Sequence, residues 1–152
     1  MPLQIRKCKE HETPPMELLL LADPSLDIVE EYVGRGSSYI AELDQQPIGV
    51  YVLLPTRPGT VELVNVAVAE EHHGKGFGKQ LVLDAVQEAA KRGCQTLEVG
   101  TGNSSVSQLA LYQKCGFRIV GVDQDFFIRH YSEKIMENGI HCRDMIRLSQ
   151  DL

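Results

Sequence analysis

Polar and apolar residues alternate, or apolar residues form short runs, in seven segments of the chain, a pattern typical of β-strands. The segments are 3–7, 38–43, 46–54, 60–68, 96–99, 117–122 and 141–148. Turn-forming residues separate the second, third and fourth segments, which indicates an antiparallel meander. We therefore expect a sheet of about seven strands.

Other segments repeat their apolar residues at helical spacing. The clearest runs from 77 to 91, where an i, i+4, i+5, i+8 stripe would pack one helix face on the sheet. Helices are also predicted over 16–22, 25–33 and 105–114, with Gly34 and Gly36 ending the second. Residues 125–138 should form a long connection with a helical turn or two. This order predicts an α/β (layered α+β) fold, a mixed, mostly antiparallel sheet with helices on both faces.

Length and charge limit the kind of protein. One domain spanning residues 1–152 accounts for the whole chain. The formal net charge of −6 argues against a nucleic-acid partner, because binding phosphate backbones needs a basic face. No apolar run approaches the ~20 residues that cross a bilayer, and the N-terminus lacks a signal-peptide core. We expect a cytoplasmic protein that binds neither membrane nor nucleic acid.

The cysteines and histidines do not have the spacing of a metal site. The cysteines are Cys8, Cys94, Cys115 and Cys142. They lie far apart in sequence, and we interpret them as structural thiols in a reducing compartment. His72 and His73 are neighbours on a predicted turn, so their side chains point apart, and no third ligand follows at a suitable spacing. No metal is expected.

A glycine-rich loop joins the strand at 60–68 to the helix at 77–91. Gly74, Gly76 and Gly78 remove the Cβ atoms that would hold a ligand away from the backbone. The N–H groups of the loop and of the first helical turn can then converge on one anion, which the helix dipole also attracts. Lys75 and Lys79 would add positive charge at the rim. The loop predicts a pyrophosphate site.

Two other phosphate motifs have different spacing, and one simpler interpretation remains. A dinucleotide fingerprint needs Gly-x-Gly-x-x-Gly within a parallel βαβ unit, and a P-loop needs Gly-Lys followed by Ser or Thr. This loop has Gly-x-Gly-x-Gly, and Lys75 precedes Gly76. The simpler interpretation is a tight strand-to-helix turn that binds no ligand.

These features resemble the GNAT acetyltransferase superfamily over nearly the whole chain. The phosphate loop of that superfamily has the form Gln/Arg-x-x-Gly-x-Gly/Ala, and residues 73–78 match it with His73 in the first position. The resemblance implies transfer of an acetyl group from acetyl-CoA to a primary amine of a small molecule or protein, by direct attack. Coenzyme A would contact His73, Gly74, Lys75, Gly76, Phe77, Gly78 and Lys79.

The resemblance also implies a gap in the sheet. In the related fold the strands that hold 64–68 and 96–99 splay apart, and their free backbone groups bind the pantetheine arm and the acyl carbonyl. The N–H of Val66, Ala67 or Val68 would be the oxyanion donor. Such a donor stabilises developing negative charge without constraining the choice of side chain.

Tyr112 matches the tyrosine that the superfamily places beside the leaving thiolate. Its phenol is a candidate general acid, and the alternative is a packing residue bonded to a backbone carbonyl. An asparagine usually precedes this tyrosine by seven residues and contacts the pantetheine arm. Ser105 occupies that position here, and Asn103 lies two residues earlier. We assign both to the cofactor site, with helix capping as the alternative for Asn103.

The base is predicted on the strand at 60–68. Glu62 and Asn65 are three residues apart, so a regular strand would direct them to opposite faces, unless a bulge changes the register. Glu62 is the first choice because a carboxylate accepts a proton and an amide does not. The alternative is a solvated strand residue.

The acceptor is less constrained. Residues 123–137 are rich in aromatic and acidic side chains and lie where the superfamily often builds its acceptor pocket, with Asp123, Asp125 and His130 as candidates. A lid packed by its aromatics is the alternative. A non-catalytic acyl-CoA binding or sensing module and a donor longer than acetyl also stay open. The superfamily commonly forms homodimers, and the resemblance admits one here.

Overall fold

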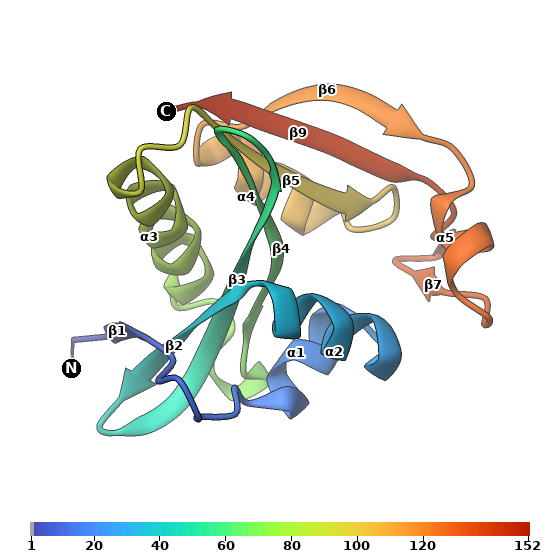
Figure 1. Cartoon of the computed structure of the whole chain (residues 1–152). Coiled ribbons are helices and arrows are strands. Elements are labelled where there is room, and N and C mark those ends of the chain that lie inside the picture. The colour runs from blue at the N-terminus through green and yellow to red at the C-terminus, as the bar shows by residue number, and fades with distance from the viewer. Residues whose placement is uncertain (1) are drawn as a thin grey trace.

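Seven strands form one mixed sheet with helices on both faces (Figure 1). The computed structural model describes residues 2–152. The sheet strands are β1 (Gln4–Lys7), β2 (Ser37–Leu43), β3 (Gln46–Arg57), β4 (Thr60–Val68), β5 (Thr96–Gly102), β6 (Arg118–Asp123) and β9 (Met145–Asp151). Their order is β1-β2-β3-β4-β5-β9-β6. Every neighbouring pair is antiparallel except β4–β5, so the predicted fold class is confirmed.

Each face of the sheet has its own apolar core. Helices α3 (Phe77–Lys91) and α4 (Val106–Lys114) pack on one face, where Leu81 and Ala85 of α3 are fully buried. On the other face lie α1 (Met16–Ala22) and α2 (Leu26–Arg35), whose buried Leu19 and Val29 pack on β3 and β4. The stripe of apolar residues in α3 therefore has the predicted role.

A bulge in β4 decides which side chains share a face. Val52 pairs with Asn65 and Leu53 pairs with Leu63, so Val64 has no partner on β3. Residues on the C-terminal side of an extra residue point to the opposite face from that expected of a regular strand. Asn65 consequently faces α1 and α2.

The pairing between β4 and β5 stops halfway. Residues 60–63 of β4 pair with residues 96–99 of β5, and no pair follows Leu63 and Val99. The gap therefore separates residues 64–68 from Gly100–Gly102, and not from 96–99 as predicted. Residues 100–102 of β5 still pair with β9 on their other side, and α4 begins at Val106, shortly after β5 ends.

The largest differences from the sequence prediction lie in residues 131–151. The last strand is β9, which begins four residues later than predicted, and His141 belongs to a separate hairpin of β7 (Met136–Glu137) and β8 (Ile140–His141). Two-residue strands are too short to show an alternating pattern. Asn138-Gly139, with φ of 55° and 72°, forms the hairpin turn, and this dipeptide is the one local signal in the sequence that indicates it. Helix α5 (Phe126–His130) is the predicted helical turn.

Gly34 does not end α2. The helix continues to Arg35, and Gly36 is the cap, with its N–H donating to Tyr32 O at 2.8 Å. The buried Tyr32 anchors the last turn on the sheet, which outweighs the low helix propensity of glycine. Strand β3 also continues through Pro55 to Arg57, leaving a tight turn at 58–59.

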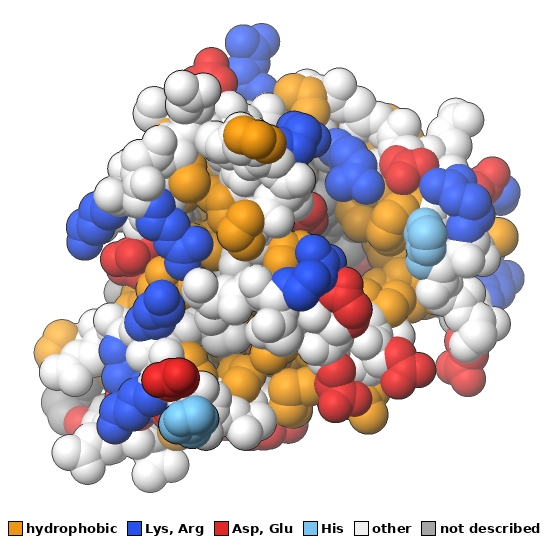
Figure 2. Space-filling model, in the orientation of Figure 1, with side chains coloured by type: hydrophobic (Ala, Val, Ile, Leu, Met, Phe, Trp, Pro, Cys, Tyr) orange, Lys and Arg blue, Asp and Glu red, His pale blue; other side chains and the backbone are white. Residues whose placement is uncertain are grey.

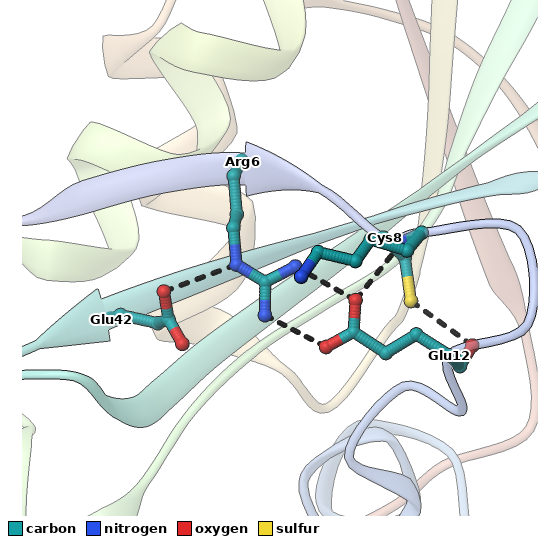
Figure 3. A network of polar contacts seen from close by, with 5 residues as sticks. Arg6, Cys8, Glu12 and Glu42 are labelled. Atoms are coloured by element: carbon teal, nitrogen blue, oxygen red, sulfur yellow. Dashed lines mark hydrogen bonds and ion pairs between the residues drawn. The ribbon is translucent and has the colours of Figure 1, made fainter.

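A polar network attaches the N-terminal segment to the sheet edge (Figure 3). The Arg6 guanidinium donates to both oxygens of Glu12 at 2.7 Å, and its Nε donates to Glu42 at 3.1 Å. The hydrogen bonds from Arg6, assisted by the Lys9 N–H, lower the pKa of Glu12 to about 2. The network links β1 and β2 to the segment that leads into α1.

Candidate active site

The loop between β4 and α3 forms one wall of a first cleft. After the short 3-10 helix η1 (Glu70–His72), Gly74 and Gly76 have φ of 78° and 83°, a region that non-glycine residues rarely occupy. No atom would lie within 4 Å of a Cβ at either position. The loop thus needs these glycines for its backbone conformation and has open space above them.

Helix α3 begins at this loop with uncapped N–H groups. Its N-cap is Gly76, which has no side chain that could accept from the first turn. The helix is 15 residues long, and its first residues line the cleft, so the positive end of its dipole lies there. Uncapped donors and a helix dipole are the features that an anion site requires, so the predicted pyrophosphate site stays a prediction.

His73 ties the loop to the end of β4. Its ring Nε2 lies 2.7 Å from the Val68 carbonyl oxygen, which can only accept, so Nε2 carries the proton. This contact holds the His73 ring against the end of β4. No group of three or more potential ligands in residues 2–152 is arranged to hold a metal ion.

The structure brings most of the predicted cofactor residues to this first cleft. Its lining includes Val66, Ala67, Val68, His73, Gly74, Gly76, Phe77 and Gly78. Lys75 and Lys79 are exposed and lie outside that lining. Ser107, Gln108 and Leu111 of α4 complete the opposite wall, and the sequence analysis did not select them.

The unpaired end of β4 presents backbone donors to the cleft. The Ala69 N–H donates to Ile48 O on β3 at 2.8 Å, and in an antiparallel ladder alternate residues point the same way. Ala67 therefore also bonds toward β3, whereas Val66 and Val68 direct their backbone groups to the side where β5 has separated. Of the three predicted oxyanion donors, Val66 and Val68 therefore have N–H groups directed into the gap, and Ala67 does not.

A second cleft lies on the other side of the gap, between α1, β5 and the segment after β6. Figure 2 shows apolar side chains gathered in a recess between the β6–β9 arch and α1–α2. Val66 and Gln108 line both clefts, so the two meet beside these residues. Gln108 and Tyr112 are four residues apart, which places them on one face of α4.

Tyr112 lines the second cleft and is 5% exposed. Its hydroxyl makes no hydrogen bond to any of the described residues, unlike the hydroxyl of Tyr51, which donates to Asp84 at 2.7 Å. Burial raises the pKa of Tyr112 well above its usual value, so the phenol keeps its proton at neutral pH. The side chain can therefore act as a proton donor.

Glu62 lines neither cleft. Its cross-strand neighbours are Leu54, which packs against α1 and α2, and Glu98. Glu62 therefore shares a face with Asn65, because β4 has the bulge that the sequence analysis named as the exception to opposite faces. Burial raises the pKa of the Glu62 carboxyl, an effect that Arg147 opposes and Glu98 reinforces.

Asn103 holds the β8–β9 connection in place. Its Oδ1 accepts the N–H groups of Arg143 and Asp144, both at 2.9 Å, and its Nδ2 donates to His141 O at 3.1 Å. It lines neither cleft and does not cap α4. Ser105 does line the second cleft, with its hydroxyl donating to Glu137 at 2.6 Å.

The acidic residues predicted for the acceptor are paired elsewhere. Asp123 forms ion pairs with Arg129 and Arg147, and Asp125 with Arg143. Asp123, Asp125 and His130 are absent from the lining of the second cleft. Asp23 and Glu137 supply its carboxylates instead.

The sequence and the fold match a known enzyme family. The model of the acetyltransferase (GNAT) family matches residues 5–117, so the chain belongs to this family and is an acetyltransferase. The uncharacterized N-acetyltransferase YvbK of Bacillus subtilis (strain 168) is 61% identical over 150 residues, covering 99% of this chain and 97% of that protein.

Two solved structures of similar proteins contain the cofactor. A Bacillus subtilis acetyltransferase in complex with CoA is 60% identical, with a TM-score of 0.94 and 99% of both chains covered. A GNAT family acetyltransferase from Elizabethkingia anophelis with acetyl-CoA bound is 43% identical, with a TM-score of 0.96, covering 99% of this chain and 98% of that one.

None of the helices in residues 2–152 is long and apolar enough to cross a membrane.

Replacing Asn103 with alanine should destabilise the protein. The change leaves two backbone N–H groups and one carbonyl without their partner, and we expect the free energy of unfolding to fall by about 1–2 kcal/mol. Urea denaturation measures this loss, with the exposed Gln87→Ala variant as control. An Asn103→Ala variant as stable as that control would show that the side chain has no structural role.

Proposed function

We propose that this acetyltransferase binds acetyl-CoA in the first cleft and transfers its acetyl group to a primary amine held in the second. The glycine loop, the uncapped start of α3 and the free edge of β4 together suit a pyrophosphate, a pantetheine amide and an acyl carbonyl. The relatives with CoA and acetyl-CoA bound share this fold over nearly their whole length, which supports the same ligand here.

The observation that carries the proposal is the end of the β4–β5 pairing after Leu63 and Val99. It opens the sheet where the two clefts meet, beside Val66 and Gln108. Donor and acceptor can thereby reach one point from opposite sides. The Val66 N–H, directed into the gap, is the proposed donor to the carbonyl oxygen.

The chemistry needs one bond formed and one broken. When acetyl-CoA is bound, the amine nitrogen forms a bond to its carbonyl carbon, the C–S bond breaks and the sulfur leaves with the electron pair. The Tyr112 phenol gives its proton to that sulfur. The attacking nitrogen loses a proton through water to Glu62, whose raised pKa suits a proton acceptor better than that of an exposed carboxylate.

No cysteine is proposed as a nucleophile. Cys142 lines the second cleft, but burial raises the pKa of its thiol, so the reactive thiolate is disfavoured. Burial has the same effect on the pKa of Cys115, which lines neither cleft. Direct attack by the amine fits both observations.

The second cleft favours an enzyme over a non-catalytic acyl-CoA binding module. A module of that kind needs only the first cleft, whereas here an acceptor cleft with a free phenol opens at the same gap. Thioester consumption with a panel of amines distinguishes the two, since binding of coenzyme A without consumption would leave only the module.

Gly76→Ala should weaken coenzyme A binding. Alanine in the left-handed region costs about 1–2 kcal/mol, and its Cβ would enter the open space above the loop. We expect the Kd for coenzyme A, measured by titration calorimetry, to rise about 10-fold or more. Gly121→Ala is the control, because its Cβ also meets open space without a positive φ. An unchanged Kd in Gly76→Ala would remove the loop from the site.

Tyr112→Phe should lower kcat by about 100-fold and change the KM for acetyl-CoA less than about threefold, because only the proton donor is lost. Its stability should stay close to that of the wild type, since the hydroxyl has no partner among the described residues. Tyr51→Phe breaks the bond to Asp84 and should lower stability while leaving kcat unchanged. A Tyr112→Phe enzyme with normal kcat would exclude the acid role.

The pH profile tests Glu62. The carboxylate form is the base, so activity should rise as pH rises through its pKa, which burial places above the ordinary ~4.3. Glu62→Gln should remove this acidic limb and leave the limb set by the acceptor amine. Glu98→Gln removes a neighbouring negative charge that raises the pKa of Glu62, so its limb should move to lower pH. The role is excluded if Glu62→Gln has the wild-type profile.

A further inference from the structure

Asp23 is a carboxylate without a cationic partner in the second cleft. Its Oδ2 accepts from the Tyr32 hydroxyl at 3.1 Å, and its Oδ1 accepts from the Tyr131 hydroxyl at 2.9 Å and the Ser25 N–H at 3.2 Å. All three donors are neutral. No Lys, Arg or His of residues 2–152 forms an ion pair with it, and the negative end of α1 adds to its charge.

The directions of these hydrogen bonds leave Asp23 able to accept further hydrogen bonds and leave no free donor beside it. The Tyr32 hydroxyl accepts from Asn65 Nδ2 at 2.8 Å, so its own proton is committed to Asp23. The proton of Tyr131 is committed in the same way. Burial and the neighbouring Asp23 raise the pKa of both phenols, so both keep these protons at neutral pH. An incoming anion would find no free donor here, whereas a cation would find a carboxylate.

The hydrogen bonds of Asp23 also extend to Asn65, which is adjacent to Val66. Asn65 is adjacent to Val66, where the two clefts meet, and is 4% exposed. Its Nδ2 donates to Leu19 O and to Tyr32, but its buried Oδ1 has no partner among the described residues. A hydrogen-bond path thus runs from Asn65 through Tyr32 to Asp23 and across the cleft to Tyr131. Asp23 lies two hydrogen bonds away from Asn65.

The rest of the cleft has the same electrostatic sign. The charged residues in its lining are Asp23 and Glu137, and no basic side chain is among them. Glu137 likewise accepts only from neutral groups, the hydroxyls of Ser104 and Ser105. Asp123 and Asp125, outside the cleft, are paired with arginines. The volume of about 410 Å³ is that of a small-molecule site.

We propose that the acceptor is a small dicationic amine, whose reacting nitrogen lies beside Val66 and whose second, unreactive cationic group binds Asp23. This rests on the proposed acetyl transfer and specifies its substrate class. Asp23 is then a specificity residue: it contacts the far end of the acceptor, with the rings of Phe127 and Tyr131 lining the same wall. The roles proposed above for Tyr112 and Glu62 are unchanged.

Three linear acceptors of similar length test the charge at the far end. They are 1,5-diaminopentane, n-pentylamine and 5-aminopentanoate, which carry a positive, a neutral and a negative distal group. We expect kcat/KM to be about 10-fold or more higher for the diamine than for pentylamine, and lowest for the amino acid. Diamines of three, four and six carbons, each beside its monoamine, extend the series so that spacing does not decide the result.

Asp23→Asn should reduce the preference for the diamine over pentylamine to about threefold or less. The preference is a ratio within one enzyme, so partial loss of folded protein does not change it. Asp44→Asn, an exposed aspartate in the β2–β3 turn, is the matched control and should keep the full preference. Tyr131→Phe removes a neutral donor from Asp23 and should keep or increase it.

The outcomes separate this proposal from the function on which it rests. Equal turnover of diamines and monoamines, or a preference that persists in Asp23→Asn, would overturn the dicationic acceptor and leave acetyl transfer intact. Turnover of no amine, with coenzyme A still bound, would overturn both.

Discussion

The functional architecture depends on one interruption in the sheet. β4 and β5 begin as a regular parallel pair, and their hydrogen bonding ends after four residues of each strand. Unpaired backbone groups inside a protein are costly unless a ligand or water satisfies them. The gap therefore exposes groups of the main chain itself, with the loop before α3 on one side and the second cleft on the other. Val66 and Gln108 belong to both sides because they border the gap.

Charge is distributed in two ways over the same molecule. Carboxylates on the outer surface, such as Glu12, Asp123 and Asp125, are bound by arginines. The two carboxylates of the second cleft are bound only by hydroxyl and N–H groups. Neutral donors hold a carboxylate in position without cancelling its charge. The cleft therefore keeps a negative potential that a cationic ligand can use.

Much of the fold was predictable because each element carries its own local pattern. The stripe of α3 and the glycines at its N-terminus depend on residues close together in sequence. Tyr112 was selected because the segment around it, which is contiguous in sequence, resembles the segment that holds the family's tyrosine. Asp23 was not predicted, because its partners Tyr32 and Tyr131 are 9 and 108 residues away. The role of Asn103 depends in the same way on residues about 40 positions later.

The sequence by itself determined the class of fold and the glycine loop before α3, since these follow from hydrophobic periodicity and from glycine at positions of positive φ, and its resemblance to the family supplied the candidate acid. The tertiary structure alone decided where the β4–β5 pairing ends, that a bulge at Val64 turns Glu62 and Asn65 to one face, and which carboxylates remain unpaired. Strand register and charge pairing both depend on contacts between segments that are distant in sequence. No local pattern encodes them, because each depends on what the rest of the chain places opposite.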